Sequence, residues 1–232
     1  MPLIQGLLPA LLAIPDGAAQ GAVLLLHDVF GRSPFYENVA GRLALAGFAT
    51  LLPDFFFREG PLSQTTEAAA AARRAIADSR RLLQDALTAA DWLTQRYGSR
   101  LGTIGFCMGG NYAFAMAAER TNLATVCYYG FPGRAIHFTQ DPAGPTPIDL
   151  APRMSGPMIG FWGDQDRGAG MDNVAAFARA MEPRDTPFEH HIYAGAGHGF
   201  FAASGLDPSN PLYVDACDSW TRTLAFLRRH IP

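Results

Sequence analysis

The chain has 232 residues, of which 49% are hydrophobic, and its formal net charge is −3 at pH 7. These values are typical of one globular domain and exclude a disordered chain. The slightly acidic balance leaves no basic stripe for a phosphate backbone, so we expect no nucleic-acid partner. Adjacent arginines at residues 73–74, 80–81 and 228–229 lie in helical patterns beside acids or alanines, and we interpret them as solvated helix faces.

Three further features bear on where the protein works. No stretch reaches the ~18 uninterrupted apolar residues of a membrane-spanning helix, so we expect no membrane partner. The apolar N-terminal run has no Lys or Arg before it and is interrupted by prolines, which argues against an export signal. The cysteines Cys107, Cys127 and Cys217 share no CxxC spacing, which disfavours a disulfide framework or a structural zinc ion. We therefore expect a cytoplasmic protein without a metal.

Short apolar runs alternate with helical patterns along almost the whole chain. In chain order the patterns predict a strand over 3–14, a strand over 22–26, a helix over 35–46, a strand over 48–52, one or two helices over 65–97, a strand over 101–105, a helix over 107–120, a strand over 124–129, a strand over 158–162, a helix over 171–181, a strand over 188–193 and a helix over 212–230. The segment 130–156 contains five prolines and four glycines, so it is predicted to be a loop with one short helical turn over 148–154.

The order of these elements defines the expected architecture. The strands are continuously apolar, as in a parallel sheet that helices cover on both faces. No linker or repeat divides residues 1–232, so we predict a single α/β domain with a mainly parallel sheet. Ligands of such sheets bind beyond the carboxyl ends of the strands, so candidate site residues should follow strands.

The segment Gly105-Phe106-Cys107-Met108-Gly109 lies between a predicted strand and a predicted helix. It matches the nucleophile elbow G-x-nucleophile-x-G, with Cys in the place that Ser usually takes. Glycines suit this motif because the sharp turn brings neighbouring backbone close, and the helix N-terminus favours a thiolate. We predict that Cys107 is a nucleophile; the alternative is a buried structural cysteine at a glycine-rich turn.

A thiol nucleophile needs a base and a residue that orients the base. Of the six histidines, His198 lies in a glycine-flanked loop after the strand 188–193, where this type of sheet places its base. Asp164 and Asp166 both follow the strand 158–162. We favour Asp166 as the partner of His198 because it lies further out, whereas Asp164 could brace the loop. The chain order nucleophile, acid, histidine is that of α/β-hydrolases.

The strand 22–26 is followed by a loop with the sequence HDVFG. An oxyanion hole in this fold combines the amide after the nucleophile with an amide from an early loop. The backbone N–H groups of Val29 and Met108 are therefore predicted to form it.

At this point the sequence resembles the dienelactone hydrolase family. The resemblance implies a single-domain α/β-hydrolase fold that hydrolyses a small ester or lactone through an acyl-enzyme, with no cofactor. It also implies a triad of Cys107, Asp166 and His198. The matching segments are HDVFG (27–31), ALAGFATLLPDFFFREG (44–60), IGFCMGGNYA (104–113), VCYYG (126–130), GPMIGFWGDQD (156–166) and YAGAGHGFF (193–201).

The resemblance also suggests residues that bind substrate or control the thiol. The family usually has Glu, close to the thiol, where Asp28 stands; the alternative role of Asp28 is to brace its loop. Family members hold a substrate carboxylate with arginines, and Arg58 lies in a matching segment. A second arginine after the catalytic histidine has no counterpart here, because Gly199 and Phe200 follow His198, which suggests a less anionic substrate. Phe200 is one of several aromatics expected near the pocket.

Two other readings of the same residues remain open. The chain could be a small-molecule binding protein that keeps an idle hydrolase fold, although binding alone needs neither His198 nor Asp166. A thiol redox sensor would lack an obvious resolving cysteine, because Cys127 and Cys217 fall in a predicted strand and a predicted helix. We expect a small ester or lactone as the partner and a monomer or homodimer in solution.

Overall fold

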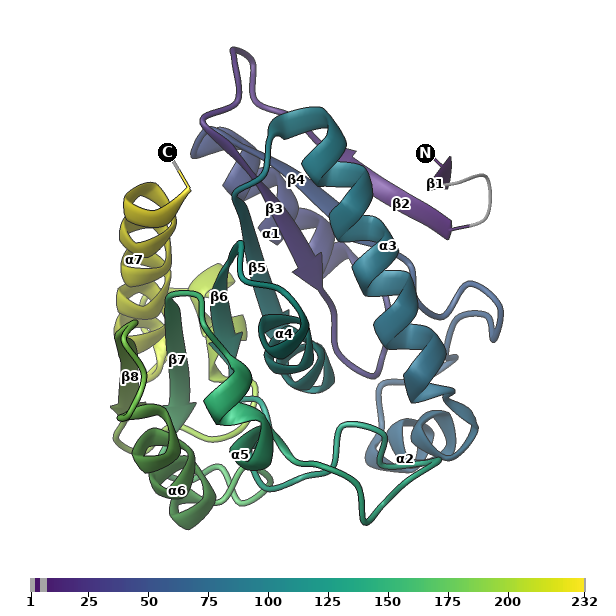
Figure 1. The fold of residues 1–232 in the computed structure, drawn as a ribbon, viewed down its shortest axis with the longest axis vertical. Coiled ribbons are helices and arrows are strands. Elements are labelled where there is room, and N and C mark those ends of the chain that lie inside the picture. Colours follow the sequence, from purple (N-terminus) through teal and green to yellow (C-terminus); the bar gives the residue numbers. More distant parts are fainter. Residues whose placement is uncertain (1–2, 5–7, 232) are drawn as a thin grey trace.

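The computed structural model describes residues 3–4 and 8–231. Within them, the centre of the fold is one sheet with the strand order β1-β2-β4-β3-β5-β6-β7-β8 (Figure 1). Neighbouring strands pair in parallel from β4 to β8, whereas β1 and β2 at one edge are antiparallel. The strands are β1 (Leu3–Ile4), β2 (Leu8–Ala13), β3 (Gly21–Leu26), β4 (Phe48–Pro53), β5 (Leu101–Phe106), β6 (Leu123–Tyr128), β7 (Met158–Gly163) and β8 (Phe188–Tyr193).

Helices cover both faces of this sheet. They are α1 (Pro34–Leu45), α2 (Glu67–Ile76), α3 (Ser79–Tyr97), α4 (Met108–Glu119), α5 (Pro147–Leu150), α6 (Met171–Met181) and α7 (Tyr213–His230). Alternate residues of β3 belong to two separate hydrophobic clusters, one with α3 and α4 residues and the other with α1 and α7 residues. In Figure 1, α3 and α4 lie in front of the sheet and α1 lies behind it. The predicted α/β-hydrolase fold is confirmed.

The sequence patterns and the structure differ at two places. Leu3–Ile4 and Leu8–Ala13 are two short antiparallel strands where one strand was expected. A 3₁₀-helix at Phe200–Gly205 follows the His198 loop and was not predicted. Of the one or two helices expected over 65–97 the structure has two, because Ala77 is extended and the Asp78 side chain caps α3 by accepting the N–H of Arg81. The predicted helical turn over 148–154 corresponds to α5 and the 3₁₀-helix Ala151–Arg153.

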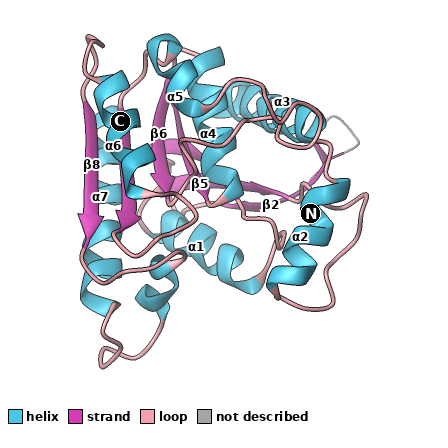
Figure 2. Cartoon of the chain, turned by 90° about the horizontal axis from the view of Figure 1, so that it is seen from below, coloured by secondary structure: helices cyan, strands magenta, loops and turns pink. Residues whose placement is uncertain are grey.

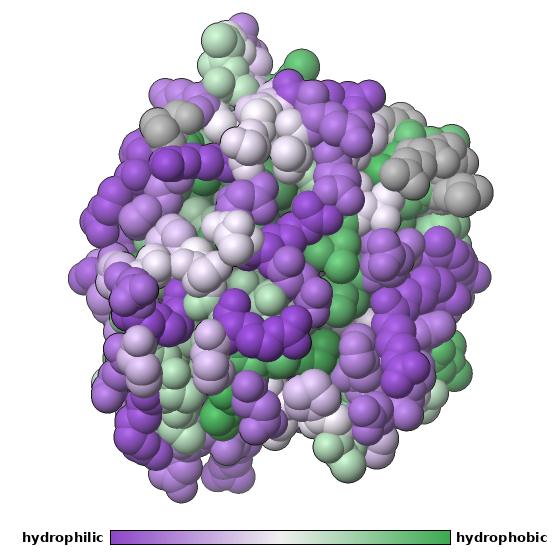
Figure 3. All heavy atoms as spheres, in the orientation of Figure 1, coloured by the Kyte–Doolittle hydropathy of each residue, from purple (hydrophilic) through white to green (hydrophobic). Residues whose placement is uncertain are grey.

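The parallel strands point their carboxyl ends to one edge of the sheet, where α2 and the loop after β6 lie (Figures 1 and 2). Polar and charged residues dominate the face in Figure 3, with apolar residues between them in its middle. None of the helices within residues 3–4 and 8–231 has the length and hydropathy needed to cross a bilayer.

Candidate active site

Cys107 lies at the turn from β5 into α4, with φ of 55° and ψ of −116°. A positive φ at a residue other than glycine stores backbone strain, which is common at functional positions. The neighbouring glycines make the turn possible. A Cβ at Gly105 would lie 2.2 Å from the Gly109 carbonyl oxygen, and one at Gly109 would lie 2.3 Å from that of Leu26. The first turn of α4 therefore packs closely against the end of β3. Cys107 itself remains partly exposed.

His198 lies near both of its predicted partners. Its Nδ1 lies 2.8 Å from Oδ2 of Asp166, and the Cys107 side chain is close enough to raise the pKa of the ring. The Asp166 carboxylate is fully buried, and its Oδ1 accepts the N–H groups of Gly168 and Ala169 at 2.9 and 3.1 Å. The structure thus brings Cys107, His198 and Asp166 together at one site.

Asp164, the other candidate acid, braces the loop before His198. Its Oδ1 accepts the N–H of Gly195 at 2.8 Å and a side-chain N–H of Gln165 at 3.0 Å. Of the two aspartates, the structure pairs Asp166 with the imidazole.

The groups around His198 favour a protonated imidazole. Burial opposes a positive charge on His198, but the hydrogen bonds with Asp166 and Cys107, together with their negative charges, raise its pKa to about 10. Burial acts to raise the pKa of Asp166, but the hydrogen bond and the charge of His198 lower it overall. An imidazolium held by a carboxylate can deliver a proton to a leaving group.

Aromatic rings fix the orientation of His198. Tyr129 meets the imidazole edge-on with centroids 4.9 Å apart, and Phe131 stacks on it at 5.2 Å with planes 19° apart. Phe131 is held in turn by Asn111 of α4, whose side chain accepts the Phe131 N–H at 2.7 Å and donates to its carbonyl oxygen at 3.2 Å. The elbow helix therefore also positions the ring that supports the histidine.

The two residues whose amides are predicted to form the oxyanion hole both line a small cavity beside Cys107. Val29 comes from the loop after β3, and Met108 is the first residue of α4. The N–H groups in the first turn of a helix have no partner within the helix, so that of Met108 is available to a ligand.

Asp28 has contacts that fit both roles considered for it. Its Oδ1 accepts the N–H of Phe30 at 2.8 Å, which braces the loop, and its carboxylate also contacts the hydroxyl of Tyr36. Burial raises the pKa of Asp28, although these hydrogen bonds and the nearby His198 oppose the shift. The carboxylate is thus close enough to His198 to respond to its charge.

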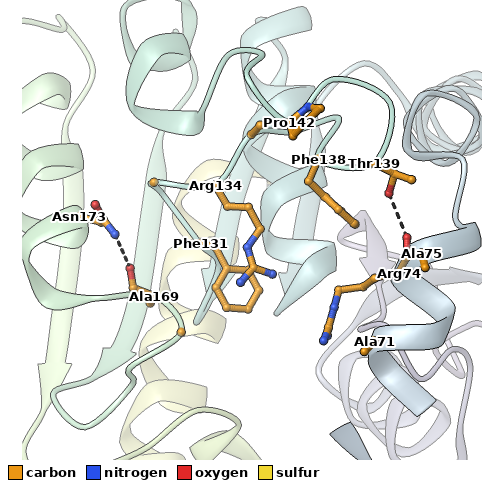
Figure 4. Close-up of a pocket in the computed structure, with 13 residues that line it drawn as sticks. Ala71, Arg74, Ala75, Phe131, Arg134, Phe138, Thr139, Pro142, Ala169 and Asn173 are labelled. Atoms are coloured by element: carbon orange, nitrogen blue, oxygen red, sulfur yellow. Dashed lines mark hydrogen bonds between the residues drawn. The ribbon is translucent and has the colours of Figure 1, made fainter. Parts of the chain in front are cut away.

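A hollow of about 650 Å³ lies between α2 and the loop after β6 (Figure 4). It shares Arg74, Phe131, Arg134 and Phe138 with the small cavity beside Cys107, so the two spaces adjoin. Figure 4 shows Arg74 from α2 and Arg134 from the loop projecting into the same space. The site therefore opens to solvent past two guanidinium groups.

Arg74 and Arg134 were not among the predicted site residues. The interpretation of residues 73–74 as a solvated face is wrong: Arg73 is 2% exposed, stacks on Phe56 and donates to the Gly60 carbonyl, and Arg74 lines the hollow. A signal existed for Arg134, because it follows β6 at the carboxyl edge of the sheet, where ligands bind. The position of Arg74 depends on how α2 packs, which local sequence patterns do not reveal.

Two other predicted residues lie away from the thiol. Arg58 forms an ion pair with Asp85 at 2.7 Å, stacks over Phe57 and is not among the residues that line the hollow or the small cavity. Phe200 is 3% exposed and packs beneath the His198 loop against Tyr129. The structure brings neither residue to the space beside Cys107.

Within the part of the chain that the structure describes, no cluster of three or more His, Cys, Asp or Glu residues is placed to hold a metal ion. Cys107, Cys127 and Cys217 are all free.

A strained strand-to-helix turn after a central parallel strand, with Asp166 after a later strand paired to a histidine after β8, is the arrangement of an α/β-hydrolase. A model of the dienelactone hydrolase family matches residues 8–231. The chain belongs to the dienelactone hydrolase family and is a hydrolase of that kind. Family membership confirms the predicted class of enzyme and disfavours the idle binding protein.

Individual relatives agree with this assignment. A carboxymethylenebutenolidase from Rhodococcus opacus is 34% identical over 229 residues, which cover 96% of this chain and 86% of that protein. A Bradyrhizobium protein assigned as a 2-oxo-3-(5-oxofuran-2-ylidene)propanoate lactonase is 30% identical, covering 99% of this chain and 87% of that one. A solved structure from Klebsiella pneumoniae, assigned as a dienelactone hydrolase, is 25% identical with a TM-score of 0.81, covering 94% of this chain and 92% of that one.

Proposed function

We propose that this enzyme hydrolyses a small lactone or ester that carries a carboxylate, with Cys107 as its nucleophile. The observation that carries the proposal is the hydrogen bond between Asp166 and His198, with the Cys107 side chain at the elbow close enough to act on the pKa of the imidazole. A structural cysteine would need neither an imidazole beside it nor a buried carboxylate behind that imidazole.

The first half of the reaction is acyl transfer to sulfur. The Cys107 thiolate attacks the carbonyl carbon, and the carbonyl electrons move to the oxygen, which the amides of Val29 and Met108 stabilise. When the tetrahedral intermediate collapses, the ester or ring oxygen leaves and takes the proton from His198. The product is a thioester on Cys107.

The second half releases the acid. Neutral His198 accepts a proton from water while the water oxygen attacks the thioester carbon. Collapse of the second intermediate expels the thiolate and restores the imidazolium beside it. Asp166 keeps the ring in one orientation through both halves.

The two arginines at the hollow support an anionic substrate. Within the described residues no carboxylate lies within ion-pair distance of Arg134, whose guanidinium stacks over Phe131 at 4.2 Å. Burial and the charge of Arg74 lower the pKa of Arg134, while Cys107, Glu67 and Asp166 oppose the shift. Arg74 already pairs with Glu67, so a substrate carboxylate would bind chiefly to Arg134 and would offset the remaining repulsion between the two guanidiniums. We therefore replace the expectation of a less anionic substrate with that of a carboxylate-bearing one.

The nucleophile is tested by comparing the wild type with Cys107→Ala and Cys217→Ala on a panel of lactones and esters. We expect Cys107→Ala to lose turnover and Cys217→Ala, the matched cysteine control on α7, to keep it. Mass spectrometry of the wild type quenched during turnover should detect the acyl group on Cys107. Full activity of Cys107→Ala would overturn the proposal.

The substrate charge is tested with one ester in two forms, a free carboxylate and its neutral amide. For Arg134→Gln we expect KM to rise about tenfold or more with the carboxylate, because a charge-assisted hydrogen bond is lost, and little change with the amide. Arg58→Gln is the control, since Arg58 pairs with Asp85. Equal effects of Arg134→Gln on both forms, or a carboxylate-specific effect of Arg58→Gln, would contradict this assignment.

A further inference from the structure

His27 is a fully buried histidine directly after β3 that the proposed reaction does not use. Its ring lies among three aromatic rings, with centroid distances of 6.2 Å to Tyr36, 5.1 Å to Phe55 and 5.6 Å to Phe56. Burial lowers its pKa to about 4, so it is neutral at physiological pH. A buried, neutral imidazole needs partners for both ring nitrogens.

The two hydrogen bonds of His27 define its tautomer. The N–H of Phe55 donates to Nε2 at 3.2 Å, so Nε2 carries no proton. Nδ1 therefore carries the proton and donates it to the carbonyl oxygen of Asp28 at 2.7 Å. The Gly31 N–H donates to the same carbonyl at 3.2 Å. The ring thus links the loop after β4 to the loop after β3.

The carbonyl of Asp28 and the N–H of Val29 belong to the same peptide group. The described part of the chain has no cis peptide bond, so these two groups point in opposite directions. Because His27 holds the carbonyl toward the buried ring, the Val29 N–H is turned away from it. Val29 lines the small cavity together with Cys107 and Met108.

We infer that His27 is a positioning residue that aims the Val29 amide at the oxyanion. The inference rests on the proposed function, because it assigns a role within that oxyanion hole. His27 contacts no substrate. Without this bond only the longer one from Gly31 holds the carbonyl, so the peptide can rotate more easily. Such a rotation moves a donor away from the developing negative charge and can bring a carbonyl dipole toward it.

The test compares His27→Gln with His27→Leu and His27→Phe. Gln retains one donor and one acceptor, Leu removes both, and Phe removes both while keeping an aromatic ring among its neighbours. Loss of one oxyanion donor lowers kcat about 10²–10³-fold, so we expect partial misplacement in the Leu and Phe variants to lower kcat about 10–100-fold with little change in KM. The Gln variant should recover most of the rate.

A second readout separates this role from a general disturbance of the fold. Alkylation of Cys107 by iodoacetamide forms no oxyanion, so its rate should match that of the wild type in all three variants. Thr50→Val is the control, because it removes a buried side-chain hydrogen bond within β4 and should leave kcat unchanged. Wild-type kcat in both His27→Leu and His27→Phe, or equal losses of alkylation and hydrolysis, would overturn the inference.

The wild type provides a test that does not depend on folding of the variants. The Cys107 sulfur adds to the carbonyl carbon of an aldehyde analogue of the substrate. The product is a hemithioacetal whose oxygen enters the proposed oxyanion hole. We expect the NMR signals of the Val29 and Met108 amides to shift on addition, and the His27 Nδ1–H signal to persist. An unchanged NMR signal of the Val29 amide would overturn the inference. Absence of ester turnover together with a shifted Val29 amide would instead refute the proposed function alone.

Discussion

The two carboxylate oxygens of Asp166 have different hydrogen-bond partners. Its Oδ1 is held by the N–H groups of Gly168 and Ala169, so the carboxylate cannot rotate, and Oδ2 is left for His198. This arrangement fixes the ring nitrogen that faces Cys107. The same negative charge maintains the proton on His198 well above its ordinary pKa.

We predict that Asp166→Asn lowers kcat/KM about 10²–10⁴-fold, because an amide can hold the imidazole in the wrong tautomer and provides no charge. The pKa of His198, followed by NMR, should fall below its value of about 10. In the wild type, stability from protonated His198 is fully present below pH ~6.5 and is lost as pH rises through 10, so the variant should lose less stability over this range.

Asp164→Asn is the matched control for this prediction. Asp164 braces the turn at Gly195 and makes no contact with the imidazole, so its variant should keep an elevated His198 pKa and most of the activity. A larger loss in Asp164→Asn than in Asp166→Asn would contradict the assignment of the acid.

At the scale of elements, the contact between α4 and β3 brings together the two loops proposed to form the oxyanion hole. A Cβ on Gly109 would lie 2.3 Å from the carbonyl oxygen of Leu26 and 2.7 Å from that of His27. Both neighbours are backbone atoms, so neither can swing aside as a long side chain could. This close approach brings the loop that carries Val29 beside the first turn of α4.

We predict that Gly109→Ala lowers the free energy of unfolding by about 3 kcal/mol, because the added methyl group overpacks a rigid backbone contact. It should also reduce kcat, since β3 and α4 must move apart. The control is Gly41→Ala in α1, where a Cβ meets nothing within 4 Å. It should stabilise the protein by about 0.5–1 kcal/mol. Chemical denaturation measures both, and a neutral Gly109→Ala would refute the close contact.

Local patterns were sufficient for most elements and for the elbow. Apolar runs between turn residues gave the strands from 22–26 to 188–193, and the glycines around Cys107 indicated the turn before its helix. The boundary between α2 and α3 was left open because alanines continue across it and only the Asp78 cap decides it. A polar cap is a weaker signal in sequence than glycine or proline.

At the scale of the whole molecule, the hollow beside the site lies between segments that are far apart in the chain. Arg74 and Arg134 both line the hollow there, although 59 residues lie between them in the sequence. Such a meeting follows from the packing of α2 against the loop after β6, which no local pattern encodes. The sequence could therefore indicate the triad, whose members each follow a strand, but not this pair.

Gln140 ties these two segments together. Its Oε1 accepts the N–H and the hydroxyl of Ser79, and its Nε2 donates to the Ala77 carbonyl at 3.1 Å. The adjacent Thr139 hydroxyl donates to the Arg74 carbonyl at 3.0 Å (Figure 4). The loop that carries Arg134 is thus fastened at the junction of α2 and α3.

We predict that Gln140→Leu raises KM for a carboxylate-bearing substrate about three- to tenfold, because the lost bonds, each worth about 1 kcal/mol, allow the two guanidiniums to separate. The change in kcat should be small, since the triad lies outside this contact. Limited proteolysis should cut the loop after β6 faster in the variant. Asn122→Ala, which removes an exposed side-chain bond to Ser99 before β5, should change neither. An unaltered KM and an unaltered cleavage rate in Gln140→Leu would contradict this prediction and would mean that the packing of α2 alone keeps Arg74 and Arg134 in place.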